Sequence, residues 1–295
     1  MASEFELIDL FKGIGSEYYK ENGVIIPPGD DCAIIDLSQP IITSVDASVA
    51  GVHFPLDANS EDIAYRSIAV ALSDLAAMGC NPRAFSLSVT SPETNIDWYR
   101  RFALGTKEIA EKYKISLIGG DVTKGPMNIN VIVYGTAYKS KVLKRSEAKV
   151  GDFICISSQV GRAAKGLSDW LSGNTNSIFV RDYLKPIPKF ELGKSIIESA
   201  TACIDTSDGL LADLEKMLRA SKCGAIIQLD DIPITSDIND INAGDDYDLC
   251  FTIPKDKYDT EFYKIGEVTK ETDIKLISHK GYDVNIKGYE HFRNE

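Results

Sequence analysis

Aspartates that stand beside glycines or next to apolar runs are the residues best suited to chemistry in this chain. They recur along its length, as Asp30, Asp31, Asp46, Asp74, Asp121, Asp205, Asp208, Asp245, Asp246 and Asp248. A single Asp-Gly pair is ordinarily a turn or a helix cap. Several of these acids, however, follow or end apolar stretches, as at Asp46, Asp121 and Asp205. Because α/β proteins place ligand sites at strand ends, the combination predicts a binding site.

Carboxylates gathered in one place repel one another unless a cation lies between them. Oxygen ligands without His or Cys select hard ions, and Mg²⁺ above all when a nucleotide is bound. The three histidines, His53, His279 and His291, are far apart, and no Cys-x-x-Cys pair occurs. The pattern therefore predicts phosphoryl transfer assisted by Mg²⁺, in which positioning and charge neutralisation do most of the catalysis.

Other common phosphate and hydrolase motifs are missing. The sequence has no Gly-x-x-x-x-Gly-Lys-Ser/Thr loop and no Gly-x-Ser-x-Gly elbow. Gly13-Ile-Gly15 lacks the third glycine of a dinucleotide-binding turn and follows no strand signal. Phosphate binding by a glycine-rich loop is therefore not expected.

Charge and composition limit the partners. The chain has 295 residues, 44% of them hydrophobic and 26% charged, which is the balance of a globular protein of about two domains. Its formal net charge of −12 disfavours nucleic acid and anionic lipid, because phosphate contacts need Lys and Arg. We therefore expect no nucleic-acid or membrane partner, and cations must accompany any phosphorylated ligand.

The expected location is the cytoplasm. No apolar run approaches the roughly 20 residues that span a bilayer, and the acidic start lacks the features of a signal peptide. The six cysteines are scattered, mostly among apolar or small residues, which predicts buried reduced thiols rather than disulfides or a zinc site.

The elements that would position the aspartates alternate between strands and helices. A capping box at Ser3 and Glu6 begins a short helix. Residues 33–37 and 41–45 are expected to be paired strands. Periodicity then predicts helices at 60–78 and 96–113 and strands at 84–90, at 115–118 before Gly119-Gly120-Asp121, and at 128–138.

A charged stretch without periodicity, residues 139–149, is the best domain boundary. Beyond it we expect strands at 152–157, 225–229, 249–253 and 273–277 and helices at 163–171, 189–199 and 209–223. The chain is therefore expected to be an α/β or α+β protein with domains at 1–140 and 146–295.

Six motifs follow one another along the chain, namely Gly29-Asp-Asp-Cys-Ala33, Gly51-Val-His-Phe54, Ala71-Leu-Ser-Asp-Leu-Ala-Ala-Met-Gly79, Gly119-Gly-Asp121, Ile204-Asp-Thr-Ser-Asp-Gly-Leu210 and Gly244-Asp-Asp-Tyr-Asp-Leu-Cys-Phe251. Together they resemble the thiamine-monophosphate kinases. The motifs stand in that family's order and cover nearly the whole chain. The wider superfamily includes aminoimidazole ribonucleotide synthetase, selenophosphate synthetase and a hydrogenase maturation factor. The resemblance implies a two-domain fold with an ATP- and metal-binding, dimerising N-terminal domain and a C-terminal domain that completes the site.

The resemblance also implies residue roles. Mg²⁺ ions around the ATP phosphates would be held by Asp30, Asp46, Asp74, Asp121, Asp205 and Asp208. ATP would contact Gly120, Asp121, Arg145 and Ser207, and thiamine monophosphate would contact His53, Asp245 and Tyr289. Three positions depart from the family: Asp245 and Asp248 replace glutamates and are each one methylene shorter, and Lys124 replaces a frequent arginine. The implied reaction is ATP-dependent phosphorylation of thiamine monophosphate to thiamine diphosphate, the last step of that cofactor's biosynthesis.

The chemistry of a phosphate acceptor agrees with this set. The second pKa of a phosphate monoester is about 6, so its attacking oxygen is already ionised at neutral pH. No general base is needed, and the difficulty is the repulsion between two polyanions. At about 4 Å, two unit charges repel by about 4 kcal/mol at an effective dielectric near 20. Bridging Mg²⁺ ions would remove that repulsion and align the oxygens for in-line transfer.

Two alternatives stay open. One is another ATP-dependent synthetase of the superfamily, although selenophosphate synthetase would need a reactive residue in the segment before Gly29, which has no cysteine. The other is a non-catalytic protein whose solvated aspartate turns bind divalent cations. Taken singly, His53 also suits a packed loop histidine, Arg145 a solvated linker charge and Tyr289 an ordinary aromatic.

Overall fold

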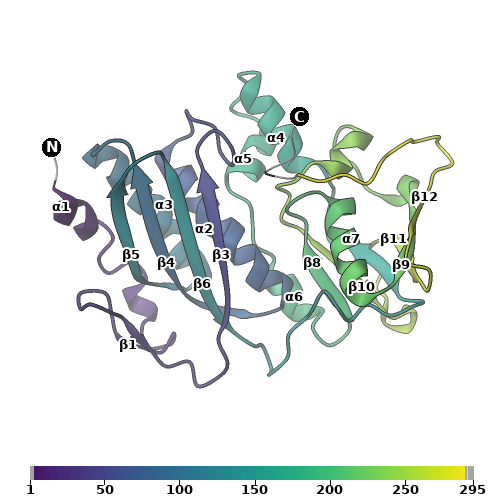
Figure 1. The fold of residues 1–295 in the computed structure, drawn as a ribbon, viewed down its shortest axis with the longest axis horizontal. Helices are drawn as coiled ribbons and strands as arrows, with labels where there is room; N and C mark the ends of the chain where they lie inside the picture. Colours follow the sequence, from purple (N-terminus) through teal and green to yellow (C-terminus); the bar gives the residue numbers. More distant parts are fainter. Residues whose placement is uncertain (1–2, 290, 292–295) are drawn as a thin grey trace. The chain divides into compact units, whose positions relative to one another are not determined.

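The computed structural model describes residues 3–289 and residue 291. Its contacts divide the chain into two compact units. The N-terminal unit comprises Met1–Leu75 and Cys80–Ser140, and the C-terminal unit comprises Ala76–Gly79 and Lys141–Glu295. Each has its own β-sheet (Figure 1).

The N-terminal unit contains a four-stranded sheet in the order β3-β6-β4-β5. Its strands are β3 (Ile42–Val49), β4 (Asn81–Ser91), β5 (Ser116–Lys124) and β6 (Asn128–Thr136). β4 and β5 are parallel, and the other two pairings are antiparallel. Figure 1 shows α2 (Ser60–Ala77) and α3 (Ile96–Tyr113) together on one side of this sheet. The four strands and two helices provide the frame for the first group of aspartates.

The other face of this sheet is open within the unit. Along β3, exposed residues alternate with half-buried or buried ones, as expected for a strand with one covered face. Val45 is 64% exposed and lies opposite Ile132 of β6, which is 38% exposed. The open face therefore carries exposed apolar side chains on the edge strand β3 and on the adjacent β6.

Smaller elements border this sheet. α1 (Glu4–Asp9) begins with the predicted capping box of Ser3 and Glu6. η1 (Ser16–Tyr18) follows, and then β1 (Val24–Ile26), which pairs with β2 (Ile34–Ile35). The prediction that residues 33–37 pair with 41–45 is wrong, because β3 takes β6 as its neighbour and leaves β2 to β1.

The C-terminal unit contains a six-stranded sheet in the order β12-β9-β11-β7-β10-β8. Its strands are β7 (Phe153–Ile156), β8 (Ala202–Asp205), β9 (Gly224–Gln228), β10 (Leu249–Ile253), β11 (Tyr263–Thr269) and β12 (Ile274–Ile277). Its helices are α4 (Arg162–Leu171), α5 (Ile178–Leu184), α6 (Phe190–Ser195), α7 (Leu210–Ser221), η2 (Leu229–Asp231), η3 (Ile238–Asn242) and η4 (Lys255–Lys257). All sheet pairings are antiparallel except that of β12 with β9.

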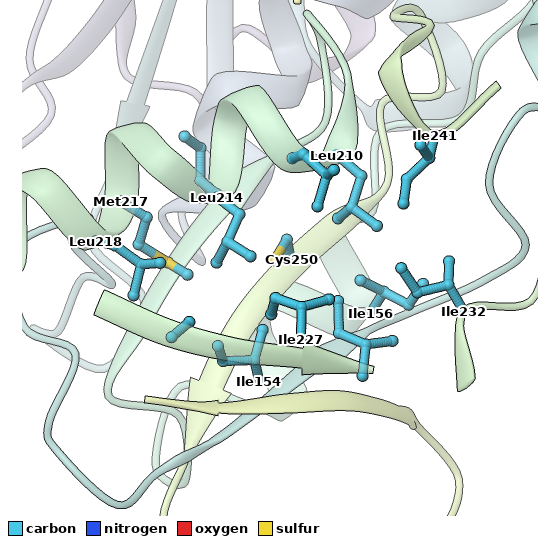
Figure 2. Packing of buried hydrophobic residues seen from close by; sticks show 14 of the residues in the cluster. Ile154, Ile156, Leu210, Leu214, Met217, Leu218, Ile227, Ile232, Ile241 and Cys250 are labelled. Atoms are coloured by element: carbon cyan, nitrogen blue, oxygen red, sulfur yellow. The ribbon is translucent and has the colours of Figure 1, made fainter. Parts of the chain in front are cut away.

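The core of this unit forms where α7 covers the sheet. Leu210, Leu214, Met217 and Leu218 recur at helical spacing and are all buried. Figure 2 shows these side chains directed toward sheet residues that include Ile227 and Cys250. The helix that follows the Asp205–Asp208 segment is therefore fixed by apolar packing.

The mixed α/β class and the two-part fold predicted from the sequence are confirmed. The sequence did not reveal α5 or β11, and the helix expected at 189–199 is the shorter α6. All six cysteines are free thiols, five of them buried, and Cys32 is exposed. Among the described residues, no helix combines the length and apolar character needed to cross a membrane.

Candidate active site

Asp46 and Asp74 face one another in the N-terminal unit. Asp46 lies on the helix-covered side of β3, and Asp74 lies near the C-terminal end of α2, as the sequence predicted. Ser44, two residues before Asp46 and on the same face, donates its hydroxyl to Asp74. Burial and the neighbouring Asp74 charge raise the pKa of Asp46 to about 6. A cation can relieve a carboxylate whose ionisation is opposed in this way.

β3 continues past Asp46 to Val49, so Asp46 is in mid-strand rather than at the strand end that the sequence suggested. The chain then turns tightly, and His53 returns to the strand end. The Nδ1 atom of its ring accepts a 3.0 Å hydrogen bond from the backbone N–H of Val49, and the backbone N–H of His53 donates to the Val49 carbonyl. A neutral His53 ring therefore carries its proton on Nε2, the atom that can donate to a phosphate oxygen.

Asp30, Gly120 and Asp121 line a cavity of about 260 Å³ in the same unit. Polar groups from residues 29–32 and 119–121 meet apolar side chains, which are Ile8, Phe11, Leu87, Val89, Leu117, Ile118 and Val122. The exposed thiol of Cys32 is also part of the lining. This cavity has a polar part suited to phosphates and an apolar part suited to an aromatic base.

The Gly119-Gly120-Asp121 segment lies inside β5, so the expected strand end at residue 118 is wrong. A Cβ on Gly120 would lie 2.0 Å from the carbonyl oxygen of Leu87 on β4. Strand packing thus requires glycine here, whether or not a nucleotide binds. Asp121 lies opposite Ser88 in the parallel pair and is exposed.

The Asp46–Asp74 pair and the Asp30–Asp121 pair do not meet within the N-terminal unit of a single chain. β3 and β5 are the two edges of the sheet, and the row Asp46–Val131–Leu87–Gly120 crosses it. Three strand spacings of about 4.8 Å put the edges roughly 14 Å apart. In the described part of the chain, no three His, Cys, Asp or Glu side chains form a ready-made metal site.

In the C-terminal unit, Asp205 ends β8, at the strand end that the sequence predicted. Its side chain is buried. A turn follows before α7, and the buried carboxylate of Asp213 caps it by accepting from the N–H groups of Asp208 and Gly209 at 2.9 and 3.2 Å. Lys216, one turn of α7 further on, pairs with Asp208 and with Asp213. Asp208 is thereby neutralised and held at the start of the helix.

Four predicted residues meet at this turn. The N–H of Asp245 donates to the Ser207 carbonyl at 2.9 Å, and the Tyr247 hydroxyl donates to Asp245 at 3.1 Å. The N–H of Tyr289 donates to the Asp208 carbonyl at 3.1 Å, and its ring is half exposed. The C-terminal unit thus gathers Ser207, Asp208, Asp245 and Tyr289.

Arg145 lies elsewhere in this unit. Its carbonyl accepts a 2.8 Å hydrogen bond from Ser221, at the C-terminal end of α7. The helix has 12 residues and spans about 18 Å, which separates this position from Asp208 at the other end. The Lys144 carbonyl, one residue before Arg145, accepts a 3.2 Å hydrogen bond from Cys203 of β8, so this backbone also lies beside the strand that leads to Ser207.

Sequence reasoning missed the residues that support these acids: Ser44, Asp213, Lys216 and Lys189. A signal existed for some of them. Ser44 shares the strand face of Asp46 at the period of two, and Asp213 lies in the first turn of a predicted helix. Lys189 carried no such signal, because its partner Asp248 is distant in sequence.

The donor chemistry fits Mg²⁺. Each group offers carboxylate oxygens, and burial and the neighbouring Asp74 charge raise the pKa of Asp46. Mg²⁺ is commonly bound by one or two carboxylates together with substrate phosphates, so a cage of three protein acids is not required. The same donors do not suit zinc, which prefers Cys and His.

Comparisons with known proteins agree with these features. Residues 29–138 match the family model described as AIR synthase related protein, N-terminal domain. The chain is 36% identical to a thiamine-monophosphate kinase of Buchnera aphidicola from Acyrthosiphon pisum, covering 98% of this chain and 99% of the relative. It is 33% identical to the thiamine-monophosphate kinase of Haemophilus influenzae, covering 98% of both chains.

Solved structures give the same result. The crystal structure of thiamine-monophosphate kinase from Stenotrophomonas maltophilia matches with a TM-score of 0.83 and 31% identity, over 93% of this chain and 96% of that one. AaThiL complexed with AMPPCP and TMP matches with a TM-score of 0.80 and 28% identity, over 98% and 97%. The chain therefore belongs to the thiamine-monophosphate kinase family and is a phosphotransferase that acts on a phosphate group.

Proposed function

We propose that this protein transfers the γ-phosphoryl group of ATP to thiamine monophosphate in an Mg²⁺-dependent, direct in-line reaction that yields thiamine diphosphate and ADP. The observation that carries the proposal is the match, over nearly the whole of both chains, to a relative complexed with AMPPCP and TMP. The reaction is the last step of thiamine diphosphate biosynthesis. We place it in the cytoplasm, in keeping with six unpaired thiols.

The residues divide the work by charge. Asp30, Asp46, Asp74, Asp121, Asp205 and Asp208 hold Mg²⁺, and Gly120, Asp121, Arg145 and Ser207 contact ATP. His53, Asp245 and Tyr289 contact thiamine monophosphate. Bound Mg²⁺ supplies charge neutralisation between the two polyanions. The acceptor phosphate is already ionised near neutral pH, so no side chain has to remove a proton from it.

The cavity of the N-terminal unit supports a place for the nucleotide. Its apolar wall, which includes Phe11 and Leu117, suits the adenine ring, and its Asp30–Asp121 part suits the phosphate end. Cys32 lines this cavity and is the one exposed cysteine of the chain. Mg-ATP should therefore slow the alkylation of Cys32 by a maleimide, and thiamine monophosphate alone should not.

The deciding experiment is a direct assay of the products. Purified protein with Mg-ATP and thiamine monophosphate should form thiamine diphosphate and ADP in equal amounts, and excess EDTA should abolish turnover. Asp121→Asn and Asp208→Asn should fold normally and lower turnover by roughly 10²-fold or more. ADP without thiamine diphosphate would favour another synthetase of the superfamily, and the absence of nucleotide-dependent stabilisation would favour a cation-binding scaffold.

The acceptor side has its own test. A neutral or protonated His53 can donate to a phosphate oxygen, and the half-exposed Tyr289 ring offers a face to the cationic thiazolium, an interaction worth about 0.5–2 kcal/mol. His53→Ala and Tyr289→Ala should raise the KM for thiamine monophosphate roughly 10-fold, which corresponds to about 1.4 kcal/mol. A rise in the KM for ATP alone would assign both residues to the nucleotide.

We also propose that the protein is a homodimer formed over the open face of the N-terminal sheet. Support comes from the exposed Val45–Ile132 pair on β3 and β6 and from the separation of the Asp46–Asp74 pair and the Asp30–Asp121 pair at opposite edges of the sheet. Sedimentation should give twice the 32.4 kDa chain mass, and Val45→Asp should halve it. Val150→Asp, on the C-terminal unit and 60% exposed in the wild type, is the control that should leave the dimer intact.

If two copies share each site, inactive Asp74→Asn and Asp121→Asn proteins should complement one another. After random exchange of subunits, half of the dimers are mixed, and each of them regains one intact site. The mixture should then recover about a quarter of the wild-type turnover. A mixture that stays inactive would mean that each copy supplies all the acids of its own site.

A further inference from the structure

The loop of residues 244–248 has an unusual backbone. Asp245 and Tyr247 both adopt positive φ angles, of 72° and 50°. Residues other than glycine avoid this region because Cβ crowds the backbone, and such conformations persist only when the surrounding structure imposes them. Gly244, just before them, approaches so closely that a Cβ would lie 2.2 Å from the Ser207 carbonyl oxygen. The loop is therefore pressed against the Ser207 turn in a conformation that needs support.

The support comes from the two aspartates that alternate with the strained residues. Asp246 accepts hydrogen bonds from the N–H groups of Gly161 and Ala163, at 2.7 and 3.0 Å, at the start of α4. Asp248 accepts from the hydroxyls of Ser157 and Ser158, the former at 3.1 Å.

Lys189, just before α6, completes this support. Its Nζ lies 2.8 Å from the Asp248 carboxylate. The Asp248 side chain is only 11% exposed and that of Lys189 is 30% exposed, so the pair is partly shielded from water. Charge-assisted hydrogen bonds of this kind are stronger than those between neutral groups. Two separate segments, residues 157–163 and Lys189, thus hold the loop.

The strained residues are attached to the other side. Asp245 and Tyr247 donate their N–H groups to Ser207 and Thr206, each at 2.9 Å. The Tyr247 hydroxyl then fixes the Asp245 carboxylate at 3.1 Å. Asp246 and Asp248 therefore anchor the loop, while Asp245 is presented beside the Ser207 turn.

We propose that Asp248 and Lys189, together with Asp246, are positioning residues that hold the 244–248 loop so that Asp245 is presented to the phosphorylated acceptor. The inference rests on the proposed function, because it takes Asp245 as a contact of thiamine monophosphate. It adds residues that touch neither substrate in this scheme and act through Asp245. A purely structural ion pair would instead affect stability without separating the two substrates.

The test compares three variants at Lys189 and Asp248. Lys189→Met and Asp248→Asn should raise the KM for thiamine monophosphate about 10-fold and leave the KM for ATP within about two-fold. Lys189→Arg should keep the KM for thiamine monophosphate close to that of the wild type, because a guanidinium can still pair with Asp248. Lys165→Met is the matched control: Lys165 pairs with the shielded Asp169 in the same unit but contacts no residue of the loop in the described interactions.

A second measurement does not depend on turnover. Amide hydrogen exchange at Asp245 and Tyr247 should be faster in Lys189→Met than in the wild type or in Lys165→Met, since a released loop opens more often. Faster exchange with equal changes in both KM values would overturn the positioning role, and so would unchanged exchange. A wild type that forms no thiamine diphosphate would refute the proposed function instead, while the exchange result would still decide whether these residues hold the loop.

Discussion

Asp46→Asn should stabilise the metal-free protein above pH 6, even though it removes a proposed metal ligand. Burial and the Asp74 charge raise the pKa of Asp46 from its ordinary 3.8 to about 6. The folded state therefore holds this proton more tightly than the unfolded chain does. Stability contributed by this site falls as pH rises from 3.8 to 6, and above pH 6 the folded protein carries an ionised, poorly solvated acid.

The size of the effect follows from the shift. A difference of 6 − 3.8 = 2.2 pKa units corresponds to about 3 kcal/mol at 1.36 kcal/mol per unit. Because Asp46 is only partly buried, solvent screening reduces this, and a gain of about 1–2 kcal/mol is expected for the neutral asparagine. Mg²⁺ should reverse the order of stability, since a cation favours the ionised wild type and has less to bind in the variant.

Urea unfolding at pH 5 and pH 8, with EDTA and with Mg²⁺, measures the free energies. The variant should be more stable than the wild type at pH 8 in EDTA, and its advantage at pH 5, which lies between the unfolded and folded pKa values of Asp46, should be about half as large. Asp256→Asn, at an exposed position on η4, is the control and should leave the free energy of unfolding unchanged at both pH values. Some pH dependence should remain in Asp46→Asn, because burial also raises the pKa of Asp246 to about 6. A variant less stable than the wild type at pH 8 in EDTA would refute the reasoning.

Three further predictions concern stability. Leu214→Ala removes a fully buried side chain of the core in Figure 2 and should lower the free energy of unfolding by about 2–4 kcal/mol in urea, whereas Leu171→Ala, at a position that is 75% exposed, should change it little. Gly120→Ala places a Cβ 2.0 Å from the Leu87 carbonyl oxygen, so its Tm should fall by several degrees, as differential scanning calorimetry would record; an unchanged Tm would contradict the close β4–β5 approach. Asn95→Ala removes the side chain that caps α3 and should cost about 0.5–2 kcal/mol in urea, while Asn95→Ser should retain most of it.

Long amphipathic helices were predictable because their signals are local. The helix expected at 96–113 is α3, residue for residue, with Asn95 as its cap and Lys114 ending it in a left-handed conformation. The helix expected at 60–78 differs from α2 by one residue. Strand pairing was less predictable, because the partner of β3 is β6, about 80 residues further along the chain, and nothing near residue 42 specifies it.

The candidate site also has parts that local sequence signals predict and parts that only the fold determines. The preceding apolar runs singled out Asp46 and Asp205, and an adjacent glycine singled out Asp208, because those signals are written in the sequence. The metal-binding roles of these acids and of Asp74 come from the family resemblance and stay predictions. The grouping of these acids depends on sheet order, which leaves β3 and β5 at opposite edges. Asp245, Asp246 and Asp248 have the same chemistry, and only the fold distinguishes the presented carboxylate from the anchors.

The position of the Asp205–Asp208 turn between β8 and α7 affects how the enzyme loses activity. Both flanking elements contribute buried side chains to the core, and such segments open only when the whole unit unfolds. The Asp30–Cys32 segment is exposed and belongs to no strand or helix longer than a single bridge. Mild heating should therefore first loosen the Asp30–Cys32 segment, which we propose to be part of the nucleotide site. Loss of the arrangement around Asp208 should coincide with cooperative melting of the C-terminal unit.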